Sequence, residues 1–191
     1  MTLEERRSMP AVYEPAEDSR LLAETAVERI EDGSVLEVGI GSGYVADRIA
    51  NETDATVLGS DISPEACFRA REEGIETVRG NLTRPFVADS FDVVLFNPPY
   101  LPTTPESEWD DPLEYALSGG PDGRKVIRPF LSDLGRVLRP GGRGYLLVST
   151  LTDPEAVSKL AVDAGLATRE IASESFPFER LVVLEITHGN T

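Results

Sequence analysis

The sequence predicts an α/β fold: a doubly wound, Rossmann-like sheet of seven mostly parallel strands. Two observations carry this prediction. Short apolar, β-branched runs alternate with helical patterns from residue 34 onward, which is typical of parallel strands joined by helices. The last two runs, 167–173 and 180–187, are joined by so short a connection, Phe176–Glu179, that we expect an antiparallel hairpin at the C-terminus.

The elements of the first half follow from the spacing of apolar residues. A helix that opens at Glu17–Ser19 is predicted by residues at helical spacing: Leu21, Leu22, Thr25, Ala26 and Ile30. Strands are predicted at 34–38, 55–61 and 76–80, with a helix through Val45 and Ile49 after the first. Ser63-Pro64 suits a helix start, and the helix at 64–73 would place Ala66, Cys67 and Ala70 in the core.

The second half begins with a buried strand at 91–96. This run is apolar and stops at two prolines, which cannot donate to a β-ladder. An amphipathic helix follows, with apolar positions at Ile127, Phe130, Leu131, Leu134 and Leu138. Arg139–Gly142 is predicted to stop it, before a strand at 144–149 and a helix at 153–164.

Length and composition indicate one domain over 1–191, with an N-terminal helical segment at 1–33 and a core at 34–191. One cysteine excludes an internal disulfide framework, and no apolar run approaches membrane-spanning length, so we expect a cytoplasmic protein. Acidic residues number 34 against 18 basic ones, of which two are lysines. The acids occur in nearly every segment, and this acidic, lysine-poor composition resembles that of proteins from salt-loving archaea. The net charge of −16 disfavours nucleic acid as a partner.

The main candidate site is Asn97-Pro98-Pro99-Tyr100, directly after the strand at 91–96. Ligands of an open α/β sheet bind beyond the carboxyl ends of its strands. The Asn97 side-chain carbonyl and the Pro98 backbone carbonyl can accept both N–H groups of a planar NH2, while the Tyr100 ring stacks on the attached π-system. This arrangement suits a carboxamide or an adenine amine, whose nitrogen is a poor nucleophile until its N–H groups are held.

A second candidate site follows the strand at 34–38. Its pattern is Glu-x-Gly-x-Gly-x-Gly, from Glu37 through Gly39 and Gly41 to Gly43. Such glycines let a ligand approach the backbone at a helix N-terminus. A dinucleotide fingerprint would need its third glycine at position 44, where this chain has Tyr44, so that interpretation is disfavoured.

Two further strand ends carry polar candidates. Asp61 can accept two ribose hydroxyls through its carboxylate oxygens, or cap the helix that begins at Ser63. Asn81 can contact an adenine edge and Leu82 its face, or the pair can simply form a turn.

The segment 101–123 is long for a loop inside a compact domain, and such loops are usually functional or disordered. Trp109 could anchor a substrate or pack beneath the loop. A glycine-rich turn, Ser118–Arg124, closes the segment.

These features resemble those of class I S-adenosylmethionine-dependent methyltransferases over nearly the whole chain. Asn97–Tyr100 is similar to motif IV of the members that methylate amide or amino nitrogens. Tyr13–Ser19 together with Ser118–Arg124 resembles the short HemK-type protein-glutamine N5-methyltransferases of archaea and eukaryotes. Those enzymes modify the glutamine of the Gly-Gly-Gln loop in the class 1 translation release factor.

The resemblance implies that the chain consists of the catalytic core alone, with neither a general base nor a metal site. Asn97, Pro98 and Tyr100 would be catalytic and, with Pro99, would bind the substrate amide. S-adenosylmethionine would be held by Ser19, Glu37, Gly39, Gly41, Gly43, Asp61, Asn81, Leu82 and Asn97. Asn81 departs from the aspartate that many relatives carry at this position.

The resemblance also implies a partner, a small zinc-ribbon activator that pairs with the sheet edge at the third strand. Ile75 and Val78 would be its apolar contacts, unless a helix of this chain covers them. Two other classes stay open. One is an N6-adenine, N2-guanine or lysine-directed methyltransferase with the same tetrapeptide. The other is an inactive binding subunit, which would be expected to lack Asp61 or Asn97.

Overall fold

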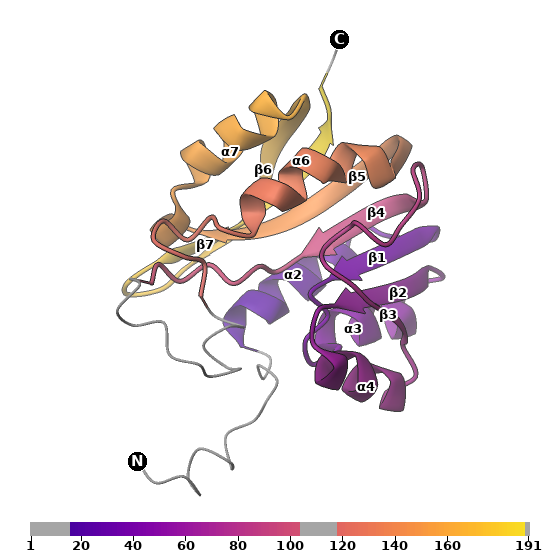
Figure 1. Cartoon of the computed structure of the whole chain (residues 1–191). Coiled ribbons are helices and arrows are strands. Elements are labelled where there is room, and N and C mark those ends of the chain that lie inside the picture. Colours follow the sequence, from indigo (N-terminus) through magenta and orange to yellow (C-terminus); the bar gives the residue numbers. More distant parts are fainter. Residues whose placement is uncertain (1–15, 104–117, 190–191) are drawn as a thin grey trace, which may run out of the picture.

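The structure is a computed structural model, and it describes residues 16–103 and 118–189. One seven-stranded sheet, in the order β3-β2-β1-β4-β5-β7-β6, forms its centre (Figure 1). Neighbouring strands from β3 to β5 are parallel, whereas β7 runs antiparallel to both β5 and β6. The predicted mostly parallel sheet with a C-terminal antiparallel hairpin is confirmed.

The predicted elements occur with small shifts of their ends. The strands are β1 (Ser34–Val38), β2 (Thr56–Asp61), β3 (Glu76–Arg79), β4 (Phe91–Phe96), β5 (Leu138–Ser149), β6 (Leu166–Ser175) and β7 (Arg180–His188). The helices are α2 (Glu17–Val27), α3 (Tyr44–Glu52), α4 (Pro64–Glu72), α6 (Ile127–Val137) and α7 (Pro154–Asp163), with a short 3-10 turn, η1 (Thr150–Thr152). Ile30 lies beyond the end of α2, although it is buried as the spacing predicts.

One predicted boundary is wrong. Arg139–Gly142 was expected to separate the helix from the next strand, but β5 already begins at Leu138. Phe91 of β4 pairs with Leu138 and Val93 pairs with Arg143, so the intervening Pro-Gly-Gly turn bulges out of the ladder. Gly141 accommodates this bulge with a φ of +81°.

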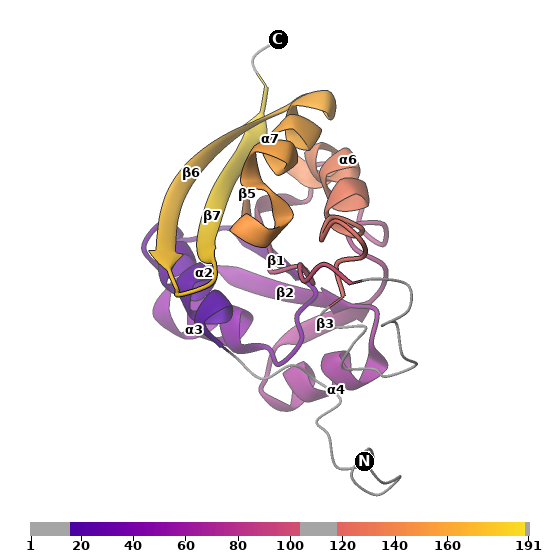
Figure 2. The same ribbon diagram turned by 90° about the vertical axis from the view of Figure 1, so that its left-hand side faces the viewer.

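Helices cover both faces of the sheet, and the two sides of β4 show why (Figure 2). Val94 and Phe96 point into a core formed with α6 and α7. Val93 and Leu95 point into the opposite core, formed with α2 and α3. A strand that is apolar on both sides must be buried on both sides, which is the physical origin of the three-layer arrangement.

Side-chain caps fix two helix starts. Ser63 Oγ accepts the Ala66 N–H at 3.2 Å, as the Ser-Pro pair predicts, and Asp153 Oδ1 accepts the Ala156 N–H at 3.2 Å. Cys67 is a free, buried residue of α4 and therefore a core side chain. Among the described residues, no helix is both long and apolar enough to cross a bilayer.

The sheet order places β3 at an exposed edge, where the sequence predicted a partner. The expected pair of contacts is corrected in part. Ile75 is only 6% exposed, because it packs in a small cluster with Ile40, Ala46 and Ala70 of its own chain. Val78 is half-buried and stays a candidate contact.

Two valines on α7 test the packing of this layer. Val157 is completely buried, whereas Val162 is 63% exposed. We expect Val157→Ala to lower the free energy of unfolding by about 2 kcal/mol, because it removes buried methyl groups and leaves a cavity. Val162→Ala makes the same chemical change on the surface and should alter stability by about 0.5 kcal/mol or less. Urea unfolding followed by circular dichroism measures both, and equal losses would contradict the packing of α7 described above.

Candidate active site

The glycine turn between β1 and α3 has the backbone conformation that its sequence predicts. Gly39, Gly41 and Gly43 have φ values of +66°, +52° and +83°, a region that L side chains rarely adopt. Gly43 is the N-cap of α3, and its N–H donates to the Ile40 carbonyl at 2.8 Å. The turn therefore brings bare backbone to the positive end of a helix.

Asp61 joins this turn to the end of β2. Its Oδ2 accepts the Gly41 N–H at 3.1 Å, and its Oδ1 accepts the Ser63 N–H at 2.8 Å. Ser63 is the N-cap residue of α4, and Asp61 supports the start of that helix through the Ser63 N–H, which is compatible with a second role as an acceptor for a ligand. Each oxygen retains acceptor capacity after one hydrogen bond, which leaves room for two hydroxyl donors.

Asn81 and Leu82 lie next to Asp61. The Gly80 N–H donates to the Asp61 backbone carbonyl at 2.8 Å, which ties the loop after β3 to the end of β2. Asn81 is exposed, and Leu82 is partly buried with a φ of +53°. The loop that carries the residues proposed for an adenine edge and an adenine face is thus joined at Gly80 to the backbone of Asp61, the residue proposed for the ribose.

Glu37 lies beneath the turn. Its Oε2 accepts the Ala46 N–H in the first turns of α3 at 2.8 Å, and the side chain is buried. Burial raises the pKa of Glu37 to about 8, although the Ala46 hydrogen bond opposes the change; the negative charge of Asp61 adds a smaller increase. The carboxyl group supports the glycine turn from within the protein.

Asn97 follows β4 at the same edge of the sheet. Its Nδ2 donates to Ser19 Oγ of α2 at 3.4 Å, which fixes the orientation of the side-chain amide. Its Oδ1 is buried and has no hydrogen-bond partner among the described residues. Since a buried acceptor without a donor is costly, by about 1–3 kcal/mol, this oxygen marks a place for a ligand N–H.

Asp18 lies in the segment Tyr13–Ser19 that carries part of the family resemblance, but it was not among the predicted site residues. It is 4% exposed, and its Oδ2 accepts the Tyr100 hydroxyl at 3.4 Å. The signal was present in the spacing: Asp18, Leu22 and Thr25 follow one another at helical intervals, and all are buried. Because its carboxylate lies on the buried face of the helix, Asp18 does more than interact with the helix dipole.

The turn Ser118–Arg124 is a second feature whose position the sequence did not reveal. A Cβ on Gly123 would lie 2.6 Å from the Tyr100 carbonyl oxygen and 2.7 Å from Thr152 Cγ2, so only glycine fits. Arg124 Nη1 donates to the Thr152 carbonyl at 2.6 Å. The turn thus packs directly against the backbone of the Asn-Pro-Pro-Tyr segment. Trp109 and Tyr13–Pro15 lie outside the described residues.

These residues fit S-adenosylmethionine. Backbone at a helix start, a carboxylate with acceptor capacity and an apolar side chain lie side by side, in the order methionine, ribose and adenine would need. A Cβ on Gly39 would lie 3.1 Å from the Phe96 ring, so the absence of a side chain keeps the turn close to the end of β4. Asn97 then provides an acceptor beside the donor site.

The raised pKa of Glu37 predicts a pH dependence of stability. Its folded-state pKa of about 8 exceeds the ordinary value of 4.5 for a glutamate, so between these pH values the folded state holds a proton that the unfolded chain has released. We expect the stability of the wild type relative to Glu37→Gln to fall as the pH rises from about 5 to about 8. Urea unfolding across this range measures the difference. A constant difference would mean that Glu37 is already ionised in the fold.

Comparison with known proteins agrees with this geometry. A family model described as a methyltransferase domain matches residues 35–117. A protein of Methanocaldococcus jannaschii, assigned as a protein N5-glutamine methyltransferase, is 37% identical over 92% of this chain and 91% of its own length. The methyltransferase HEMK2 of Homo sapiens is 32% identical over 95% of this chain and 92% of its own.

A solved structure gives the same result. The Mtq2-Trm112 complex of E. cuniculi, which is responsible for methylation of the eRF1 translation termination factor, has a TM-score of 0.77 and 28% identity to this chain. The match covers 95% of this chain and all of the matched one. The fold class and the resemblance expected from the motifs are both confirmed. The chain therefore belongs to the HemK-type protein N5-glutamine methyltransferases, enzymes that use S-adenosylmethionine as methyl donor.

Proposed function

We propose that this enzyme methylates the side-chain amide nitrogen of the glutamine in the Gly-Gly-Gln loop of a class 1 translation release factor. The Oδ1 of Asn97 carries the proposal, because it is buried and has no hydrogen-bond partner in the part of the chain that the structure describes. It is an acceptor at a strand end beside a proline carbonyl, and a primary amide brings the two N–H donors that such a pair needs. The activity assigned to the relatives supports the same acceptor group.

Catalysis on this proposal depends on positioning rather than on a strong base. When bound, S-adenosylmethionine supplies an electrophilic methyl group on a sulfonium. Asn97 Oδ1 and the Pro98 carbonyl accept the two amide N–H groups, which aims the nitrogen and favours the positive charge that develops on it. Tyr100, held by the carboxylate of Asp18, stands beside the substrate amide.

The first helix contributes to the same site. Ser19 contacts Asn97 and Asp18 contacts Tyr100, so both hydrogen bonds join α2 to the loop after β4. These contacts support the proposed division of the chain, in which residues 1–33 close a catalytic core at 34–191. They also support a role for Ser19 next to the methyl donor.

We further propose a small zinc-ribbon activator on the free edge of β3. The Mtq2 relative forms a complex with Trm112, and β3 is the outermost strand of the sheet among the described residues, so another chain can extend its edge. Because Ile75 is buried, Val78 is the apolar contact expected on this strand. We place the enzyme in the cytoplasm, with its acidic surface adapted to high salt.

Asn97→Ala tests the acceptor site. We expect kcat for methyl transfer to a purified release factor to fall about 100-fold or more, because the amide nitrogen is no longer held and oriented. Transfer of a radiolabelled methyl group, with the release-factor glutamine intact or changed to alanine, measures this effect. Duplex DNA is assayed in parallel.

Asn51→Ala is the matched control, since Asn51 is exposed on α3 and its side-chain amide donates to Asp47 of the same helix, away from Asn97. Its activity should equal that of the wild type. Full activity of Asn97→Ala would contradict the proposed site, and label in DNA or in the glutamine-to-alanine factor would contradict the proposed acceptor.

Val78→Asp tests the partner edge. We expect this substitution to abolish co-sedimentation with a purified zinc-ribbon activator in high salt, because it places a charge in the apolar part of the interface. Val87→Asp is the control, since Val87 is 74% exposed in the loop before β4. If the wild type itself stays monomeric beside the activator, or if Val78→Asp binds as tightly as the wild type, the proposed edge is wrong.

A further inference from the structure

Three large apolar side chains are exposed at one end of the sheet, beyond the carboxyl ends of its parallel strands, where the proposed active site lies. Phe178 at the tip of the β6–β7 hairpin is 95% exposed, Leu151 of η1 is 44% exposed, and Leu101 beside Tyr100 is 37% exposed. Single exposed apolar residues are ordinary on protein surfaces. Here, however, three separate loops present one each, and we call this set the rim patch.

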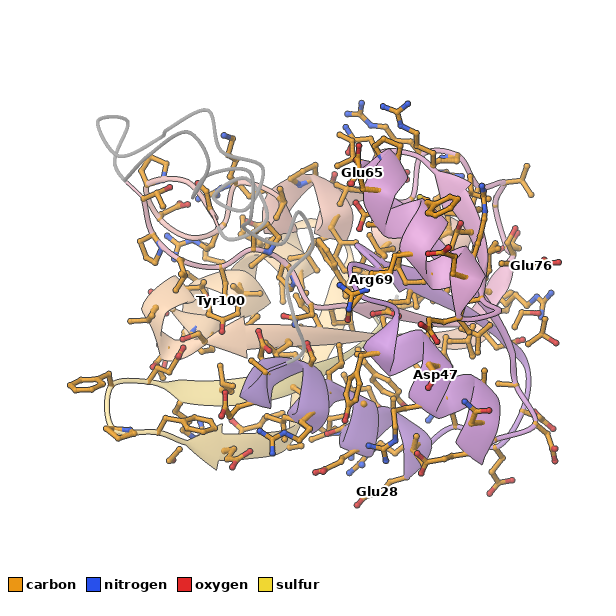
Figure 3. All side chains as sticks on the ribbon, turned by 90° about the horizontal axis from the view of Figure 1, so that it is seen from below. Glu28, Asp47, Glu65, Arg69, Glu76 and Tyr100 are labelled. Atoms are coloured by element: carbon orange, nitrogen blue, oxygen red, sulfur yellow. The ribbon has the colours of Figure 1, made fainter. Side chains whose placement is uncertain are left out.

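The register of the sheet places the hairpin tip at this edge. Ser149, the last residue of β5, pairs with Leu181 near the start of β7, so the tip 176–179 lies beyond the carboxyl end of β5. Asn97 lies beyond the carboxyl end of β4, the parallel neighbour of β5. In Figure 3 the hairpin (pale yellow) and the labelled Tyr100 both lie toward the left of the view, with the part of the ribbon that contains β5 between them.

A continuous series of contacts joins the hairpin to Tyr100. The Arg180 N–H, next to the tip, donates to Thr150 Oγ1 of η1 at 3.0 Å. Thr152, two residues on, packs against Gly123, and Gly123 packs against the Tyr100 carbonyl. These contacts pass through the buried residues Gly123 and Thr152, and they fix the positions of the three loops at the same end of the sheet.

A backbone hydrogen bond closes the hairpin tip 176–179, and the charged groups beside it are paired with other residues. The Phe176 N–H donates to the Glu179 carbonyl at 2.8 Å, which closes the turn. The Glu179 carboxylate accepts from Ser149 Oγ at 2.5 Å, and Arg180 pairs with Glu170. On a chain of net charge −16, this edge thus offers an apolar contact surface next to the acceptor site.

We propose that the rim patch docks the folded protein that carries the acceptor amide, a proposal that rests on the proposed function. Asn97 and Pro98 can hold only one side-chain amide, so recognition of a whole protein needs additional contact area near the site. The body of the protein substrate would cover Phe178, Leu151 and Leu101 while its acceptor loop reaches Asn97. An exposed aromatic residue on a rigid turn is the kind of anchor that dominates binding energy in protein interfaces.

Phe178→Ser tests the proposal by steady-state kinetics with three substrates: the intact release factor, a short peptide with the Gly-Gly-Gln sequence, and S-adenosylmethionine. We expect KM for the intact factor to rise about tenfold or more, with kcat little changed. KM for the short peptide and for S-adenosylmethionine should not change, because neither reaches the tip. Leu151→Ser should show the same pattern more weakly. Val162→Ser, on the outer face of α7, is the matched control and should behave as the wild type.

The outcomes separate this proposal from the proposed function. If the wild type transfers no methyl group to the release factor, the proposed function fails, and the docking proposal falls with it. If the wild type is active and Phe178→Ser keeps the KM of Val162→Ser, only the docking proposal is overturned. Sedimentation could also show that the wild type is a dimer and that Phe178→Ser is a monomer with unchanged KM. The rim patch would then bind a second copy of this chain, and the docking proposal would again be overturned.

Discussion

The proposed active site depends on the side-chain carbonyl oxygen of Asn97, which the fold holds in place and which has no hydrogen-bond partner within residues 16–103 and 118–189. Asn97 ends a strand that is paired on both sides, by β1 and by β5, and covered on both faces. Two prolines follow, so the backbone there has little freedom to relax around the side chain. A buried acceptor costs stability, and the surrounding sheet supplies the packing that offsets this cost.

The residues that support this oxygen come from distant parts of the chain. Ser19, in the first helix, accepts a hydrogen bond from the Asn97 amide and orients it. Asp18, in the same turn of that helix, accepts a hydrogen bond from the Tyr100 hydroxyl. Gly123 packs against the Tyr100 carbonyl from the turn Ser118–Arg124. Each contact restrains a different atom of the loop, so the acceptor geometry exists before any substrate binds, as efficient positioning requires.

The donor side of the site is constructed differently, around backbone groups. The glycine turn presents N–H groups at the start of α3, and one carboxylate, Asp61, fastens that turn to the start of the next helix through two N–H groups. Glu37 supports the arrangement from beneath, and the burial of its own carboxyl group raises its pKa.

The sequence by itself determined the strand and helix order, the turn at Gly39–Gly43 and the placement of Asn97 at a strand end, because these depend on local periodicity and on the backbone limits of glycine and proline. Only the tertiary structure decided which polar residues meet. That Asp18 contacts Tyr100, that Gly123 must lack a side chain, and that Ile75 is covered rather than free all depend on contacts between segments far apart in the chain. The bulge at Pro140–Gly142 is similar, since a turn sequence continues a strand only when a neighbour, here β4, supplies a ladder to pair with.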